Sequence, residues 1–534
     1  MNRKCGGIAF FAGLAALYAL VFAARAWWGA WERAIHLEAG KDSYLHYEFI
    51  EARLWTRDAA LNARWRLRAP SLRVLREGRP VATVAGIQTV RLAYDPGSGT
   101  WTGRWPCPWN APEAAYEFAL ADPPDGAAAR LRRRPFSIVR RKPRALPRGF
   151  AALTWESVEP LTTLRVRTPS GRVEDWRGML DWAQFIGADA FWMLGGQTPG
   201  PNGKMWNEDN FAMIPLVARE CRRRGLRFGV YAQCYLTMSP TARLSRYRYS
   251  RDAKDGATFQ TRSISLLDPR RPDDVAELLK RFGDIPGVDF LGVDYIRNAL
   301  GGYELAEDFY SEMPGVRPPP GWGRLSREER MLYLARKKIM RRDREFIDAW
   351  QWWRAHRAAE VIRRIKERVG GAKLFWAFSL TWDKGWHHGQ DAVMFNDAGV
   401  DADALMLYEA DPEQYDALLK DWHAYIRRGQ AQLVVGDVVD WPLHQRAPDG
   451  PGDFYRRLAR AIDGIYADGP ARGVFIHDLE RALHGRLGPW STLQWMEQAK
   501  RAIQYLRSRS AGAGRDSLSG RSVGSPGEAG AAER

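Results

Sequence analysis

Three isolated acidic residues each end a short apolar run in the second half of the sequence. They are Asp294, Glu409 and Asp437. Most glycoside cleavage needs two carboxyl groups, one to protonate the leaving oxygen and one to attack the sugar or activate water. These residue types therefore point to carboxylate chemistry, and a polysaccharide is the first substrate class to consider.

The neighbours of two of these acids suggest different roles. Asp294 is followed by Arg297, whose positive charge would hold the carboxylate ionised, so Asp294 is the candidate nucleophile or base. Glu409 follows Tyr408, and a carboxyl among aromatic groups has a raised pKa and can donate a proton. The sequence thus predicts Asp294 and Glu409 as the catalytic pair.

The remaining acids have less specific interpretations. Asp437 and Asp440 are close in sequence, and one of them would hold a sugar hydroxyl or serve as an alternative acid. An acid at a strand end also commonly caps the next helix or pairs with an arginine, so a structural role stays open for each. We interpret Asp478 and Glu480, near the end of the last apolar run, as mostly structural.

Aromatic residues accompany the acids. The sequence has 24 tryptophans in 534 residues, and many aromatics fall at or just beyond the apolar runs, where they would stack on sugar rings or serve as core packing. The candidates for substrate contact are Trp155, Trp192, Trp206, Tyr231, Tyr295, Trp382, Trp386, Tyr408 and Trp441, together with Arg297 and Asp440. His387 and His388 are adjacent and make a poor metal pair, so neither a metal nor a cofactor is expected.

An eightfold repeat would position these residues. Eight apolar runs alternate with longer amphipathic stretches, which predicts an α/β fold, a (β/α)8 TIM barrel with its active site at the C-terminal ends of the strands. The expected strands are Phe150 to Trp155, Ala188 to Leu194, Arg227 to Gln233, Asp289 to Tyr295, Ala372 to Ser379, Ala404 to Glu409, Gln432 to Asp437 and Arg472 to Asp478.

The barrel is expected to span residues 148–507, with an insertion at about 300–345 that contributes a groove wall or lid. Ser326 and Glu329 form a capping box that predicts a helix start inside this insertion. The segment 508–534 is rich in Gly, Ser, Ala and Arg and is expected to be a disordered tail.

Residues 35–147 have a different texture, with short alternating runs between polar turns. This pattern predicts a small antiparallel β-sandwich. Its segment from Gly99 to Tyr116 resembles the final hairpin of immunoglobulin-like modules in exported carbohydrate enzymes, which implies a spacer or accessory role. The expected strands are Tyr44 to Leu54, Ala63 to Leu67, Ser71 to Leu75, Val81 to Ala85, Gln88 to Tyr94, Gly99 to Trp105, Ala115 to Leu120 and Ser137 to Val139.

Residues 1–34 carry a targeting signal. Arg3 and Lys4 precede an apolar run from Cys5 to Ala24, long enough for a transmembrane anchor and also compatible with a long signal peptide. Either interpretation predicts an extracytoplasmic protein, membrane-anchored or secreted.

The overall charge is a formal +17. Such a charge suits simple solvated surface, an anionic membrane or glycan, or nucleic acid. No nucleic-acid partner is expected, because no known binding module is recognisable and an export signal is present. Of the four cysteines, Cys221 and Cys234 are the pair for which a disulfide is conceivable, and no metal-binding spacing is present.

Three segments of the expected barrel together resemble the family 10-like glycosyl hydrolases, bacterial enzymes of the α-amylase-like barrel superfamily. They are Ile264 to Val275, Phe290 to Tyr295 and Trp350 to Arg357. The resemblance covers about residues 150–505 and implies a glycosidase-type barrel that acts on cell-surface or environmental polysaccharide.

The sequence departs from the pattern of this superfamily at strand four. Val293 stands where the family often has a second acid, and Gly292 and Ser379 replace the arginine and glutamate of amylases. Asp294 with Glu409 is more similar to the acid pair of α-galactosidase and α-glucosidase barrels. The sequence therefore favours an O-glycoside hydrolase; the alternative is a catalytically weak barrel that binds exopolysaccharide or scaffolds an envelope complex.

Overall fold

A computed structural model of the chain describes residues 17–22, 34–82, 88–123, 131–157, 159–197, 208–236, 247–297, 301–339, 342–381, 388–409, 411–429, 431–439, 450–466, 471–484 and 488–519. It divides into two compact units, and each is described by itself. The first contains residues 1–140, 308–320 and 343–349, and the second contains 141–307, 321–342 and 350–534. The predicted membrane segment from Cys5 to Ala24 lies outside the described residues except for 17–22. Within the described ranges, no helix combines the length and apolarity needed to cross a bilayer.

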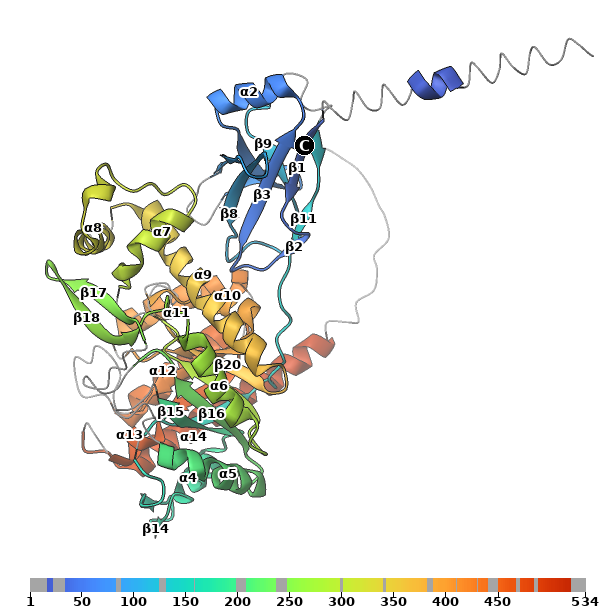
Figure 1. Ribbon diagram of the computed structural model, residues 1–534. Coiled ribbons are helices and arrows are strands. Elements are labelled where there is room, and N and C mark those ends of the chain that lie inside the picture. Colours follow the sequence, from blue (N-terminus) through green and yellow to red (C-terminus); the bar gives the residue numbers. More distant parts are fainter. Residues whose placement is uncertain are drawn as a thin grey trace, which may run out of the picture. The chain divides into compact units, whose positions relative to one another are not determined.

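The first unit holds two β-sheets around a common apolar core (Figure 1). One sheet has the order β10-β1-β3-β8-β7; the other has the order β2-β11-β9-β4-β5, with β6 beside β4. Most pairs are antiparallel as predicted, but β1–β10 and β2–β11 are parallel. The strands are β1 Ile35–Ala39, β2 Ser43–Tyr44, β3 Phe49–Thr56, β4 Ser71–Arg76, β5 Arg79–Val81, β6 Val90–Arg91, β7 Ala93–Asp95, β8 Thr100–Pro106, β9 Ala114–Leu120, β10 Leu131–Arg133 and β11 Phe136–Ile138.

One strand prediction in this unit is wrong. The run from Ala63 to Leu67 belongs to the helix α2 (Ala59–Leu67). The carboxylate of Asp58 accepts a hydrogen bond from the backbone N–H of Leu61 (3.0 Å) and so starts the helix. Leu61 and Trp65 are the buried positions of α2. Their spacing of four residues has the helical period, which the strand interpretation overlooked.

The second unit contains a closed barrel of eight parallel strands, which confirms the predicted architecture. The eight expected runs coincide with its strands to within a few residues at each end. They are β12 Phe150–Trp155, β15 Ala190–Gln197, β16 Arg227–Gln233, β19 Phe290–Asp294, β20 Leu374–Leu380, β21 Ala402–Met406, β22 Leu433–Val438 and β23 Ala471–His477, which pairs with β12. Their continuous apolar character reflects burial on both faces, inside by the barrel core and outside by helices.

Aromatic side chains fill the barrel interior. Trp192 of β15 and Trp376 of β20 stack with their ring centroids 4.5 Å apart and their planes 19° from parallel. Gly292 of β19 makes room for this stack, since a Cβ there would lie 2.2 Å from Trp376 Cε2. The barrel interior is therefore a packed core of side chains below the C-terminal ends of the strands.

Helices alternate with the barrel strands (Figure 1). Gly187, with φ of 75°, ends the first of them as expected for a C-terminal cap. The helices of and around the barrel are α4 Gly178–Ile186, α5 Glu208–Arg223, α6 Arg271–Gly283, α9 Arg344–Val369, α10 Ala392–Ala398, α11 Pro412–Gly429, α12 Pro451–Ala461, α13 Leu479–His484 and α14 Thr492–Ser519.

Two additions interrupt the alternation. A hairpin of β17 (Tyr249–Lys254) and β18 (Ala257–Ile264) precedes α6 and was not predicted. The expected insertion carries α7 (Ala306–Glu312) and α8 (Arg327–Ile339). The capping box is confirmed: the N–H of Ser326 donates to Glu329 (2.7 Å), and the N–H of Glu329 donates to the Ser326 hydroxyl (3.2 Å).

The segment expected to be a tail is partly helical. Leu506 is buried, and α14 continues past it to Ser519. The hydroxyl of Ser510 donates to the carbonyl of Leu506 (2.9 Å), one turn earlier.

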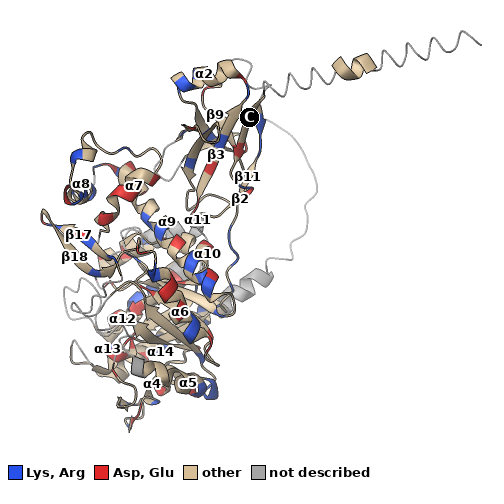
Figure 2. Ribbon diagram, viewed as in Figure 1, with Lys and Arg blue, Asp and Glu red and all other residues tan. Residues whose placement is uncertain are grey.

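The charged residues and the cysteines mark no single region of the described structure. Basic and acidic residues are interspersed on the helices and strands (Figure 2). Cys107, Cys221 and Cys234 are buried free thiols, so the conceivable Cys221–Cys234 disulfide is absent from the described structure.

Candidate functional site

A cavity of about 180 Å³ lies at the C-terminal ends of the barrel strands. Two acids from different strands, Glu156 and Asp294, open into it. The end of the barrel is where enzymes of this architecture carry their active sites. The described residues that line it are Glu156, Asp294, Tyr295, Arg297, Phe378, Leu380, Met406, Tyr408, His477 and Arg481.

Strand alternation explains why these two acids face the cavity. On β12, Phe150 and Ala152 belong to the core cluster inside the barrel, and Glu156 continues the same every-second-residue series. On β19, Phe290 faces the interior, and Asp294 follows it by four residues. Both carboxyls therefore point inward at the end of their strand.

Burial disfavours the ionised form of both carboxyls. It raises the pKa of Glu156 to about 7, with a further contribution from the negative charge of Asp294. Burial also raises the pKa of Asp294 to about 6, against the opposing effects of the Arg297 charge and the N–H of Tyr295, which donates to its carboxylate (2.7 Å). Because the negative charge of one acid disfavours ionisation of the other, the pair favours one ionised and one protonated carboxyl near neutral pH.

Neutral hydrogen-bond donors hold Glu156 in place. The amide of Gln233 donates to Oε1 (3.0 Å), and the Tyr231 hydroxyl donates to Oε2 (3.3 Å). Both side chains come from β16, and Tyr231 is fully buried. Because neither donor carries a charge, the hydrogen bonds orient the carboxyl without pairing it with a cation.

A histidine and a third acid complete the inner wall. His477, the last residue of β23, has Nε2 3.6 Å from Glu156 Oε2 and 3.5 Å from Asp478 Oδ2. Burial, with the Arg481 charge, lowers the pKa of His477 well below its ordinary value, so the ring is neutral. Its Nδ1 bonds the Thr154 hydroxyl (3.0 Å), and its ring stacks on Tyr408 with centroids 5.1 Å apart.

Asp478 is held by Arg481 on α13, whose Nε donates to Oδ2 (3.1 Å). Burial and the neighbouring Glu156 charge still raise the pKa of Asp478 to about 7. Asp478 thus adds to the negative potential of the acid cluster, although it is not among the residues that line the cavity.

The residue after Asp294 has an unusual backbone. Tyr295 has φ of 56°, a left-handed conformation that bulky side chains rarely adopt. Such strain costs about 1–3 kcal/mol and concentrates at functional sites. Here it turns the chain sharply at the end of β19, and both Tyr295 and Arg297 line the cavity.

The other two predicted acids do not line this cavity. Glu409 follows the inward-facing Tyr408 and has the opposite orientation; its Oε1 accepts the N–H of Asp411 (2.9 Å). Asp437 is fully buried and accepts a hydrogen bond from Arg457 Nε of α12 (2.8 Å). The structure therefore does not bring Glu409 and Asp437 together with Asp294, because both occupy the outward-facing series of their strands.

The other predicted substrate contacts divide into three groups. Tyr295 and Tyr408 line the cavity, and Tyr231 lies behind Glu156. Trp155 and Trp192 are buried packing residues that do not line it. Trp206, Trp382, Trp386, Asp440 and Trp441 lie outside the described residues.

Sequence reasoning missed Glu156 and His477. Glu156 directly follows the first predicted strand, and His477 lies within the last one. The available signal was the two-residue alternation counted from the strand ends. That signal is weak here because residues of both series are apolar along most of each strand.

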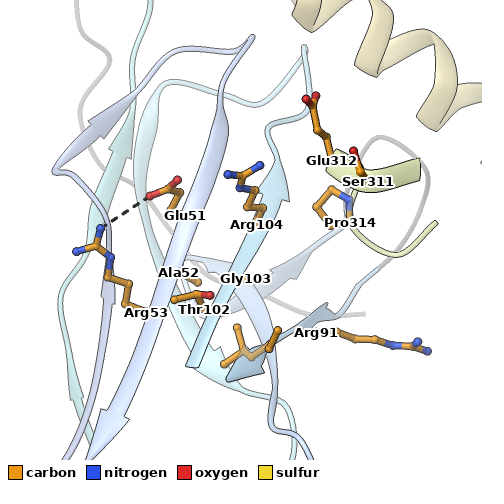
Figure 3. Close-up of a pocket in the computed structure, with 12 residues that line it drawn as sticks. Glu51, Ala52, Arg53, Arg91, Thr102, Gly103, Arg104, Ser311, Glu312 and Pro314 are labelled. Atoms are coloured by element: carbon orange, nitrogen blue, oxygen red, sulfur yellow. Dashed lines mark ion pairs between the residues drawn. The ribbon is translucent and has the colours of Figure 1, made fainter. Parts of the chain in front are cut away.

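A second, larger cavity of about 570 Å³ lies in the first unit and is lined by residues of β3, β6, β7 and β8 and by Leu92, Ser311, Glu312 and Pro314 (Figure 3). Glu51 and Arg53 pair there at 3.9 Å, and their side chains are 48% and 51% exposed. Solvent screens charges that are this exposed, so the barrel cavity, where Asp294 is buried, is the better candidate. Among the described residues, no cluster of His, Cys, Asp and Glu has the arrangement of a metal site.

No protein-family model matches the chain, and no curated protein matches it. Three solved structures similar to it are a pullulanase type I from Bacillus subtilis, a GH36 α-galactosidase from Geobacillus stearothermophilus and a glycoside hydrolase family 5 enzyme from Prevotella bryantii. Their sequence identities are 8%, 10% and 8%, and their TM-scores are 0.36, 0.35 and 0.32. The matches cover 87%, 89% and 61% of this chain and 71%, 58% and 86% of those chains. Scores this low carry no argument, and the case for a function rests on the cavity.

Proposed function

We propose that this chain is an O-glycoside hydrolase and that Asp294 and Glu156 are its working carboxyls. The observation that carries the proposal is the pair itself: two inward-facing acids from different strands that share one cavity and have pKa values raised to about 6 and about 7. Glycoside cleavage requires one protonated carboxyl as the acid and one ionised carboxylate as the nucleophile or base, and different environments can keep two acids in these two states.

The local contacts assign the roles. The Arg297 charge and the N–H of Tyr295 favour the ionised form of Asp294, so Asp294 acts as the nucleophile or as the base that activates water. Glu156 has neutral hydrogen-bond donors and the Asp294 charge beside it, so it keeps its proton and donates it to the leaving oxygen. The glycosidic C–O bond breaks, and the elements of water are added across it. Activity should rise as Asp294 ionises near pH 6 and fall as Glu156 ionises near pH 7.

The surroundings of the cavity support a sugar as the substrate. Phe378, Leu380 and Met406 give it an apolar side, and Tyr408 and Tyr295 add aromatic groups. Apolar and aromatic walls with a few fixed polar groups are typical of small-molecule sites.

The substrate's source is a further part of this proposal. The N-terminal apolar segment and the resemblance to family 10-like glycosyl hydrolases favour an extracytoplasmic polysaccharide, with the chain secreted or membrane-anchored. The β-sheet unit would then act as an immunoglobulin-like spacer or accessory module.

The test is release of reducing sugar by the full chain from a panel of bacterial and plant polysaccharides. Asp294→Asn and Glu156→Gln should each lower kcat by about 1,000-fold or more, whereas Glu409→Gln, a buried acid outside the cavity, is the matched control and should retain activity.

A substrate with a good leaving group separates the two roles. Aryl glycosides need little protonation, so Glu156→Gln should regain much of its activity on them and lose the fall near pH 7, while Asp294→Asn should stay inactive. Glycan binding without release, unchanged by either variant, would refute the proposal and favour a polysaccharide-binding barrel.

A further inference from the structure

Arg297 is a cavity-lining cation without a partner in the described structure. No ion pair among the described residues includes it, and its Nε is buried without a hydrogen-bond partner there. Its guanidinium lies over the ring of Tyr295, 4.6 Å from the centroid. Arg481, the other arginine of the lining, is by contrast paired with Asp478. Among the described residues, Arg481 is thus the lining arginine that is paired with an acid, and Arg297 is the one that has no ion pair.

The described surroundings compensate the charge of Arg297 only in part. Burial lowers the pKa of Arg297, and the Tyr295 ring offers only a weak cation–π contact. A second buried arginine, Arg354, is near enough for the two positive charges to disfavour each other. The charge of Asp294 favours the ionised form of Arg297, but the two side chains form no ion pair within 4.0 Å in the described structure. An anion from outside the protein would supply the missing partner.

We propose that Arg297 binds the carboxylate of an acidic sugar, so that the substrate is a uronic-acid-containing glycan. This inference rests on the proposed glycosidase function and specifies its substrate class. A guanidinium offers a planar fork of N–H donors that matches a carboxylate in a bidentate manner. The formal charge of +17 would also attract a polyanion to the chain.

The position of Arg297 suits this role. It follows Asp294 by three residues, beyond the end of β19, and lines the same cavity. A sugar ring placed against the Asp294 and Glu156 carboxyls would therefore have its own substituents within the cavity that Arg297 lines. The guanidinium would then distinguish an acidic ring from its neutral counterpart.

The experiment measures binding in the Glu156→Gln background of the full chain, so that turnover does not interfere. The probes are matched pairs: methyl glucuronide with methyl glucoside, and methyl galacturonide with methyl galactoside, titrated by calorimetry. At least one acidic member should bind ten-fold or more tightly than its neutral partner. Adding Arg297→Gln should abolish that preference, while Arg327→Gln, an exposed arginine of α8, should not.

Two further arms keep the result interpretable. Arg297→Lys retains the charge without the fork and should recover part of the preference, which also guards against a misfolded Gln variant. Glucose 6-sulfate tests whether any anion suffices, and binding as tight as that of the uronide would overturn the carboxylate assignment. Equal affinity for all acidic and neutral members would overturn the inference.

The outcome is separable from that of the proposed function. Cleavage of neutral glycans without any acidic preference would leave the glycosidase standing and remove the uronate assignment. Uronide binding that depends on Arg297 without cleavage of any glycan would do the reverse.

Discussion

Glu156→Gln should stabilise the folded chain at pH 8 and leave its stability unchanged at pH 4. In the folded chain the pKa of Glu156 is about 7, against an ordinary value of 4.5. Between pH 4.5 and about pH 7, Glu156 has released its proton in the unfolded chain but still holds it in the folded chain. The stability of the wild type therefore falls as the pH rises through this interval. Glutamine never ionises and avoids this loss.

The size of the effect follows from the two pKa values. The interval from 4.5 to about 7 corresponds to roughly 3.4 kcal/mol at 1.36 kcal/mol per pH unit. The side chain is 21% exposed, so solvent screens it little. With an unfolding entropy of about 2.1 cal/mol/K per residue over the ~360 residues of the barrel, this predicts a Tm increase of roughly 4 °C above pH 7.5.

The assay is thermal unfolding of both proteins from pH 4 to pH 8.5. Glu497→Gln, which removes an exposed acid of α14, controls for the loss of one negative charge. A Tm difference that does not grow between pH 4.5 and pH 7 would refute the reasoning. The charges of Glu156 and Asp294 disfavour each other, so the two substitutions are not additive. The double variant Glu156→Gln/Asp294→Asn should gain less stability than the sum of the gains of the two single variants.

Three further predictions concern residues outside the proposed pair. Asp437→Asn should lower the free energy of unfolding by about 3–5 kcal/mol, since it leaves the Arg457 guanidinium without its buried counter-charge, and denaturant titration should show this without a proportional loss of kcat. Gly292→Ala should cost about 1–3 kcal/mol because its Cβ would displace Trp376, and near-UV circular dichroism should report the disturbed tryptophan packing. Glu409→Gln should keep kcat/KM within about ten-fold of the wild type, and a larger loss would contradict its exclusion from the site.

The barrel strands could be predicted because each is a short apolar run with an amphipathic stretch after it. The strand from Arg227 to Gln233 is found with those bounds in the structure, and so is the one from Phe150 to Trp155. Burial on both faces produces such runs whatever the function. The same property concealed the site, because a run that is apolar throughout does not show which of its residues face inward.

The placement of the acids depended on that missing information. Asp294 was placed at a strand end and does line the cavity, whereas Glu409 and Asp437 belong to the outward-facing series. Glu156 went unrecognised because it becomes a candidate only through its proximity to Asp294. The two residues are far apart in the sequence, and closure of the barrel brings them together. The helix α2 was missed for a different reason. Its buried positions are Leu61 and Trp65, and two apolar residues four apart are a weak sign of a helix.

Under the proposed function, the catalytic acid and the residue that selects the sugar lie on different kinds of backbone. Asp294 is the last residue of β19, fixed by the pairing of that strand with its neighbours, while Arg297 lies beyond the turn at Tyr295. If Asp294 and Arg297 have the proposed roles, mutations after Tyr295 should change which sugar is accepted without moving the Asp294 carboxyl. Variants of this barrel with new substrate preferences should therefore be sought by diversifying position 297 while the strand is left intact.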